Sequence, residues 1–186
     1  MKKYNLIIFG FLICILFSGC NSQKESEDVY NQKANEIIIQ IIKESSCNCL
    51  LEIPKESLIE TSIAENPSFD IRSFLISELR TDNNTNLDSL ASFSKFFRLN
   101  LKALEKNNIK IVTLENLKSV KNGKGNEILK MCSKGIICIR KPIFDKTFQR
   151  AVIDYSFALT CGRVLPFPIY EFKNQKWNRV ERKNYR

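Results

Sequence analysis

The sequence contains no histidine among its 186 residues. Histidine is the side chain that changes charge near neutral pH, and it is the base in Ser-His-Asp and Cys-His active sites. Its absence excludes both of these catalytic arrangements and every metal site that needs an imidazole ligand. It does not exclude catalysis by carboxylate, lysine or tyrosine side chains. The composition therefore disfavours an enzyme without excluding one.

Several other functional patterns are missing as well. The chain has no phosphate loop, no nucleophile motif, no internal repeat and no Cys-x2-Cys pair. Because structural zinc sites typically use such cysteine pairs or histidine, we expect no metal and no cofactor. The apolar run from Leu6 to Phe17 is also shorter than the roughly 20 residues that span a bilayer.

The first 20 residues carry an export pattern. Lysines at positions 2 and 3 precede the apolar run, and Ser18 and Gly19 lead to Cys20. This arrangement predicts a signal peptide over residues 1–19. The segment Ser18-Gly19-Cys20 resembles a lipobox, with Phe17 where leucine is usual. The resemblance implies cleavage before Cys20 and attachment of acyl chains such as palmitate to its thiol. An ordinary cysteine beside another type of signal cleavage site is the alternative.

Residues 20–28 are polar and acidic, which predicts a lipidated cysteine followed by a hydrated tether. Within this segment, Lys24-Glu25 and Glu27-Asp28 resemble the short acidic signal that directs lipoproteins of the Bacteroidetes to the cell surface. We expect the protein to be held by membrane lipid through Cys20 in the cell envelope, at the outer membrane. The periplasmic face and the surface-exposed face of that membrane are the two alternatives for its location.

The chain is basic, with 29 Lys and Arg against 20 Asp and Glu. Lys2 and Lys3 are the only charged residues before Cys20, so the mature part keeps a net charge of +7. A basic balance can indicate nucleic-acid binding. Here the basic residues are scattered, and the densest stretch, 173–186, also contains Glu181. We therefore expect a solvated surface and no nucleic-acid partner.

Residues 29–186 are enough for one globular domain. A helix is predicted over about 28–45, with four isoleucines as its apolar stripe, and a second helical pattern covers 87–104. Short strands are predicted at 47–53 and from residue 109. The segment 55–86 has only a weak helical pattern, which Pro67 interrupts. The four isoleucines of the first stripe are Ile37, Ile38, Ile41 and Ile42.

In the C-terminal half, apolar and polar residues alternate as in the strands of a β-meander. Apolar residues alternate over 137–143 and 151–159, and a turn around residues 145–147 would pair position 139 with 153 and position 143 with 149. Two more strands near 167–173 and 176–182 are joined by Asn174-Gln175. We predict an α+β domain in which N-terminal helices pack on one face of a C-terminal antiparallel meander.

A family resemblance rests on four segments of this half. They are similar to the C-terminal half of small uncharacterised lipoproteins of the Bacteroidetes, especially flavobacteria. Lys141 before the proline and Gln175 in place of a glycine depart from the family pattern. Because the family has no established activity, the resemblance implies kinship and a fold, and no catalytic residue is transferred. The segments are Arg140–Asp145, Arg150–Ser156, Cys161-Gly162 and Tyr170–Trp177.

Five cysteines remain besides Cys14 and Cys20, and export favours disulfides. Because five is odd, one must stay free or pair between chains. Cys47 and Cys49 are too close in sequence to favour a bridge with each other. The meander register brings residue 132 level with residue 160, so we predict a Cys132–Cys161 disulfide. Cys138 has no comparable partner.

Two groups of residues could carry chemistry. Asp145, Asp154 and Glu171 are the carboxylates of the meander, and two acids about 5 to 9 Å apart can cleave glycosidic bonds. Four aromatic residues could form a platform for a glycan or peptide. We expect surface carboxylates in the first case and core packing in the second. The aromatic residues are Phe167, Tyr170, Phe172 and Trp177.

Three function classes follow. The leading hypothesis is a non-enzymatic accessory or binding domain of the envelope, whose partner is an envelope protein or a glycan. The alternatives are a hydrolase that acts on glycan or peptide through carboxylates, and an immunity or inhibitor protein. A pocket with two facing carboxylates would favour the hydrolase. A flat sheet face without such a pocket would favour the binding domain.

Overall fold

The computed structural model describes the backbone of residues 2–82, 84–119, 125–158, 161 and 167–181. Side chains are described from residue 24 onwards within these ranges, except at positions 119, 125, 129 and 158. The predicted α+β fold is confirmed. The elements are α1 (Lys2–Ser45), β1 (Cys49–Leu51), α2 (Leu58–Glu65), α3 (Ile71–Glu78), α4 (Leu87–Ser92), the 3-10 helix η1 (Phe93–Phe96), α5 (Leu101–Lys106), β2 (Lys110–Val112), α6 (Leu114–Ser119), α7 (Gly125–Met131), β3 (Ile136–Ile139), β4 (Ile143–Phe144), β5 (Arg150–Val152), β6 (Tyr155–Ala158), β7 (Ile169–Lys173) and β8 (Lys176–Val180).

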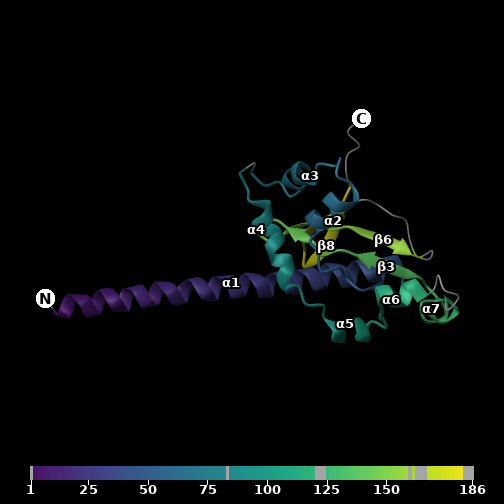
Figure 1. Ribbon diagram of the computed structural model, residues 1–186, viewed down its shortest axis with the longest axis horizontal. Helices are drawn as coiled ribbons and strands as arrows, with labels where there is room; N and C mark the ends of the chain where they lie inside the picture. Colours follow the sequence, from purple (N-terminus) through teal and green to yellow (C-terminus); the bar gives the residue numbers. More distant parts are fainter. Residues whose placement is uncertain (1, 83, 120–124, 159–160, 162–166, 182–186) are drawn as a thin grey trace.

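The described strands form two four-stranded sheets (Figure 1). The first has the order β2-β1-β3-β6, in which β1 is parallel to β2 and β3, and β3 is antiparallel to β6. The second, β4-β5-β7-β8, is entirely antiparallel. The predicted meander is therefore divided between two sheets, and the N-terminal strands join its first part.

The register of the central hairpin differs from the prediction. Ile139 pairs with Tyr155, and Ile143 pairs with Val152. Three positions separate Tyr155 from Val152, whereas four separate Ile139 from Ile143. One arm of the hairpin therefore carries an extra residue, which sequence alternation could not reveal. The predicted pairs of 139 with 153 and 143 with 149 were wrong.

The extra residue forms a bulge where the two sheets meet. Lys141 and Pro142 lie opposite Ile153, and the backbone N–H of Ile153 donates to the carbonyl of Pro168 at 3.2 Å. Proline has no N–H to give to a strand ladder, so such a position suits it. Because the bulge adds one residue, side chains before and after it point to opposite faces of the sheet. Ile139 therefore packs in the first core cluster, and Ile143 packs in the second.

The hairpin turn is also longer than predicted. The Asp145 carboxylate accepts hydrogen bonds from the backbone N–H groups of Gln149 and Arg150, at 2.9 and 2.8 Å. Phe148 adopts a φ of 54°, in the left-handed region. These features set a four-residue loop over 146–149 and shift the strand pairing. The last hairpin matches its prediction, and both of its turn residues, Asn174 and Gln175, have positive φ as in a type I′ turn.

Helix α1 supplies one side of the main core. Its predicted isoleucine stripe is buried, together with Tyr30 and Ala34. The Tyr30 hydroxyl donates to the carbonyl of Pro142 at 2.9 Å, and the Gln40 amide donates to the carbonyl of Trp177 at 2.6 Å. These two bonds fix α1 against the bulge at Pro142 and against β8. The helix also runs through residues 20–28, so residues 24–28, predicted as a tether, are helical.

A second core cluster lies on the opposite side of the second sheet, under α2, α3 and α4. Helices thus cover both faces of this sheet, whereas the sequence predicted helices on one face. Each of the three helices follows a capping residue, Ser57, Asp70 or Asn86, whose side chain accepts from the backbone N–H three residues later. Such caps stabilise a helix start by about 1 kcal/mol. The weak pattern over 55–86 therefore still forms helices.

The predicted helix over 87–104 is broken into α4, η1 and α5. Two asparagines of α1 cause the break by pairing with the backbone between η1 and α5. Asn31 accepts from the N–H of Arg98 at 2.6 Å, and Asn35 accepts from the N–H of Asn100 at 2.7 Å. The Asn31 amide also donates to the carbonyl of Phe96, and the Asn35 amide to that of Arg98. These bonds hold the backbone of 97–100 outside a helix.

Candidate functional site

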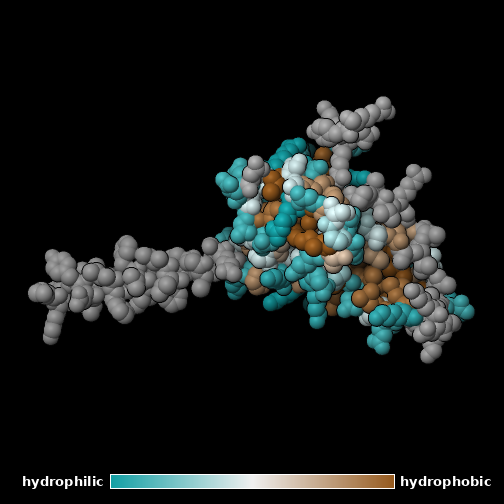
Figure 2. All heavy atoms as spheres, turned by 45° about the horizontal axis from the view of Figure 1, so that its top comes forward, coloured by the Kyte–Doolittle hydropathy of each residue, from teal (hydrophilic) through white to brown (hydrophobic). Residues whose placement is uncertain are grey.

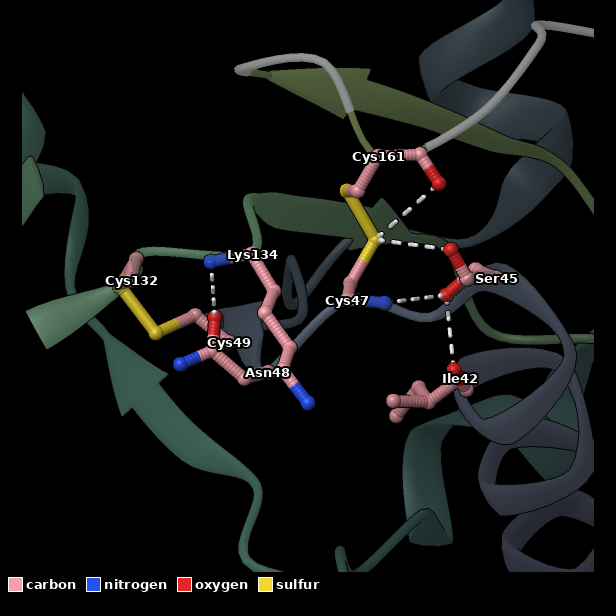
Figure 3. Close-up of a disulfide and its surroundings, with 8 residues drawn as sticks. All are labelled: Ile42, Ser45, Cys47, Asn48, Cys49, Cys132, Lys134 and Cys161. Atoms are coloured by element: carbon pink, nitrogen blue, oxygen red, sulfur yellow. Dashed lines mark hydrogen bonds between the residues drawn. A yellow bond between two sulfur atoms is a disulfide. The ribbon is translucent and has the colours of Figure 1, made fainter.

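Two disulfides link the first sheet to the segments around it (Figure 3). Cys47 is bonded to Cys161 with a Cα–Cα distance of 5.4 Å, and Cys49 is bonded to Cys132 with a Cα–Cα distance of 5.5 Å. Cys138 is the free thiol among the described cysteines, and burial raises the pKa of this thiol. The expectation of disulfides with one cysteine left over is confirmed.

The predicted Cys132–Cys161 bridge was wrong. The prediction extended the hairpin ladder back to residue 132, but the chain before β3 turns away into α7 at Gly135, which has a φ of 102°. Strand β1 lies beside β3 in parallel, with Cys49 paired to Ile136. Cys49 therefore meets Cys132 at the end of α7, and Cys47 lies at the end of the sheet that Cys161 reaches after β6.

Asn48 stabilises the same junction. Its amide donates to the carbonyl of Met131 at 3.1 Å, and its side-chain oxygen accepts from the N–H of Lys134 at 3.0 Å. The Cys-Asn-Cys segment thus holds two segments that are distant in sequence, residues 131–134 and Cys161. These interactions assign the junction to the stability of the fold.

A pocket of about 370 Å³ lies at the seam between the two sheets, under α2 and α3. Its volume lies within the usual range for small-molecule sites. The pocket has apolar walls and a few polar groups, as expected of such a site. We call it the phenylalanine pocket; its lining residues are Ser62, Glu65, Asn66, Phe69, Phe74, Arg140, Asp154 and Phe167.

Three phenylalanine rings form one wall of the pocket. Phe69 and Phe167 stack with an interplanar angle of 11° and a centroid distance of 5.4 Å. Phe74 lies 5.5 Å from each of these rings, tilted by 50°. Phe167 has a φ of 49°, a conformation that costs a non-glycine residue about 1 to 2 kcal/mol. The surrounding contacts maintain this backbone at the edge of a pocket, where such conformations often occur.

Arg140 joins two carboxylates of the pocket. Its Nη2 lies 2.5 and 2.6 Å from the two carboxylate oxygens of Glu65, and its Nε lies 3.2 Å from Oδ2 of Asp154. The Arg140 and Asp154 side chains are about one-fifth exposed, whereas that of Glu65 is 65% exposed. Arg140 follows β3 and Asp154 precedes β6, so the backbone beside the bulge positions both of them.

Burial dominates the electrostatics of Asp154. Desolvation raises the pKa of its carboxyl, and the charge of Glu65 raises it further. The guanidinium of Arg140 and the backbone N–H groups of Phe167 and Tyr155 act in the opposite direction. The rise in pKa shows that these partners do not fully replace the water that the carboxylate loses.

Ser62 contributes an unsatisfied polar group to the pocket. Its side chain lines the pocket from α2, and the residue is 4% exposed. Its hydroxyl has no hydrogen-bond partner among the described residues. A buried hydroxyl without a partner costs about 1 to 3 kcal/mol. A ligand or water that bonds to it would recover this energy.

The structure separates the other residues that the sequence singled out. Asp145 caps the hairpin turn, and Glu171 pairs with Arg150, so neither lies with Asp154. Tyr170 and Trp177 are core residues, as expected, and Phe172 packs under the ammonium of Lys33. The Cys20 side chain lies outside the described residues.

The sequence did not indicate that the phenylalanine pocket exists. Phe69 and Phe74 lie in the segment with the weak helical pattern, and Glu65 ends α2 there. Arg140 was noted only as part of a segment of the family resemblance, and Asp154 only as one of the carboxylates of the meander. Phe167 was grouped with aromatic residues of the meander. Only the two phenylalanines that follow Pro67, at positions 69 and 74, could have served as a signal.

Figure 2 shows that apolar residues also reach the surface on the face that it draws. The large apolar side chains with substantial exposure belong to five different elements, and none of them lines the phenylalanine pocket. Within the described ranges, we find no group of side chains suited to hold a metal ion and no helix long and apolar enough to span a bilayer. The exposed residues are Ile63, Phe96, Leu101, Ile111 and Leu114.

The chain was compared with known proteins. No family model matches it, and no curated protein or solved structure shows significant similarity to it. The features of this protein that bear on its function are therefore the geometry of the phenylalanine pocket and the export pattern of the sequence.

Proposed function

We propose that this protein is a lipid-anchored binding domain of the cell envelope, and that its ligand occupies the phenylalanine pocket. The observation that carries the proposal is the pocket itself, in which three phenylalanine rings adjoin a buried hydroxyl without a partner. Apolar walls with a few fixed polar groups are the usual composition of small-ligand sites. The anchor is the acylated Cys20 of the lipobox-like segment.

The structure of α1 supports presentation of this domain above a membrane. Tyr30 is the first buried residue among those of α1 whose side chains are described. About ten residues separate it from Cys20, and at 1.5 Å per residue they extend for about 15 Å of helix. Figure 1 shows that the N-terminal part of α1 projects away from the sheets. Acyl chains on Cys20 would thus hold the domain at a distance from the lipid.

The binding proposal is tested by blocking the pocket. Asn66 lines the pocket and is exposed, so Asn66→Trp can fill the entrance without disturbing the core. We expect the lipidated protein in detergent micelles to bind 2-phenylethanol saturably, and the variant to bind it at least tenfold more weakly. Isothermal titration calorimetry measures both, with empty micelles as the blank.

Asn126→Trp is the matched control, because Asn126 is exposed and lies outside the pocket. This control should bind the alcohol as the unmodified protein does. Equal binding by all three proteins would place the ligand elsewhere. No binding to any of them would contradict the proposal.

A hydrolase is the second candidate, because Glu65 and Asp154 line one pocket and burial raises the pKa of Asp154. A raised carboxyl pKa is typical of a catalytic acid. Both carboxylates are bound to Arg140, however, and the charge of this guanidinium opposes the rise in the pKa of Asp154. Hydrolysis of peptidoglycan by the purified protein, lost on Asp154→Asn, would favour this candidate over the binding domain.

A further inference from the structure

The charges of the phenylalanine pocket do not balance. Two carboxylates, those of Glu65 and Asp154, share the single guanidinium of Arg140, so the lining carries one negative charge in excess. The Asp154 side chain, which carries part of this charge, is only about one-fifth exposed. An anionic ligand would bring a third negative charge to one guanidinium, and a neutral ligand would leave the excess uncompensated. A cation would neutralise it.

The aromatic wall favours the same kind of ligand. The face of a phenylalanine ring is electron-rich and attracts an organic cation, while its apolar area favours burial of the cation's hydrocarbon part. Phe69, Phe74 and Phe167 line the pocket together with the residues of the ion pairs. The protein already makes one contact of this type, with the ammonium of Lys33 3.2 Å from the ring centroid of Phe172.

Ser62 gives an independent indication of a polar ligand atom. Its buried hydroxyl has no partner among the described residues. A protonated amine has three N–H donors, and a serine hydroxyl can accept one of them. The carboxylates of the pocket provide further acceptors.

From these observations we infer that the ligand of the phenylalanine pocket is an organic cation, namely a protonated amine on an apolar or aromatic body. The inference rests on the proposed binding function and specifies its ligand class. The apolar body packs on the three rings, and the ammonium group lies towards the carboxylates and Ser62.

Three compounds with one body and different charge test the inference. They are 2-phenylethylamine, which is protonated at pH 7, neutral 2-phenylethanol and anionic 3-phenylpropionate. We expect the lipidated protein in micelles to bind the amine about tenfold more tightly than the alcohol, and the carboxylate more weakly than the alcohol. Calorimetry against empty micelles corrects for partition into detergent.

Removal of one negative charge should reduce the preference for the amine. In Glu65→Gln, the net charge of the lining becomes zero, so we expect the ratio of amine affinity to alcohol affinity to fall from about tenfold to about threefold or less. Glu65 is largely exposed, so this variant should fold normally. Glu105→Gln removes an exposed carboxylate from α5, outside the pocket, and should keep the full preference.

The outcomes separate the ligand class from the binding function. If all three compounds bind equally, or if the carboxylate binds best, the cation inference is overturned and the pocket remains a binding site. If the preference for the amine survives in both Glu65→Gln and Asn66→Trp, the cation binds elsewhere and the inference also fails. If none of the three compounds binds, both the inference and the proposed function fail.

Discussion

Loss of the Cys49–Cys132 or the Cys47–Cys161 disulfide is expected to lower the free energy of unfolding by about 2 to 5 kcal/mol. The two bridges span 83 and 114 residues. The chain-entropy model gives each of them about 4.5 to 5 kcal/mol, because a cross-link over such a distance removes many unfolded conformations. A domain of this size is stable by only about 5 to 15 kcal/mol. Loss of both bridges should therefore leave little folded protein.

Unfolding in urea measures this effect, with the fluorescence of Trp177 as the signal. Trp177 is the only tryptophan of the chain and is 2% exposed, so its emission should change when the core opens. Cys132→Ser and Cys161→Ser each remove one bridge. Cys138→Ser is the control, because it makes the same chemical change at a free thiol. A loss below about 1 kcal/mol in both bridge variants would contradict the prediction.

The pairing itself can be assigned by alkylation. Cys47 and Cys49 lie on one tryptic peptide, so a peptide map of the unmodified protein cannot separate their partners. In Cys47→Ser, we expect Cys161 to become reactive while Cys132 stays protected. In Cys49→Ser, we expect Cys132 to become reactive while Cys161 stays protected. Protection of both Cys132 and Cys161 in both variants would instead indicate the bridge that the sequence register predicted.

Cys20→Ala is expected to abolish incorporation of a fatty-acid analogue completely. The segment Ser18-Gly19-Cys20 places this thiol where a lipoprotein would be acylated and cut. Each buried methylene contributes about 0.8 kcal/mol to membrane affinity, so loss of several acyl chains should also release the domain or leave the precursor uncleaved. Metabolic labelling and fractionation of membranes measure the two effects.

The control for this experiment is Cys14→Ala. Cys14 lies within the apolar run and has no small residues before it, so its loss should leave labelling unchanged. Continued labelling of Cys20→Ala would remove the lipid anchor from the proposed function. The phenylalanine pocket and its ligand would not be affected by that result.

The sequence by itself determined the features that depend on local pattern. The stripe from Ile37 to Ile42 predicted a buried helix face, and alternation predicted the strands on both sides of Asn174-Gln175. These predictions hold because helix and strand periods are properties of neighbouring residues. The odd number of cysteines likewise left one without a partner in the same chain, and Cys138 is the free thiol among the described residues.

Only the tertiary structure decided which distant segments meet. The bulge at Lys141-Pro142 shifts the register by one residue, and no local pattern marks it. The parallel placement of β1 beside β3 selects the partners of Cys47 and Cys49, because it brings together strands that are more than 80 residues apart. Arg140 and Asp154 lie side by side where the β3–β6 ladder ends at this bulge, next to residues of α2 and α3. The candidate binding site therefore arises from long-range pairing, which amino-acid periodicity does not encode.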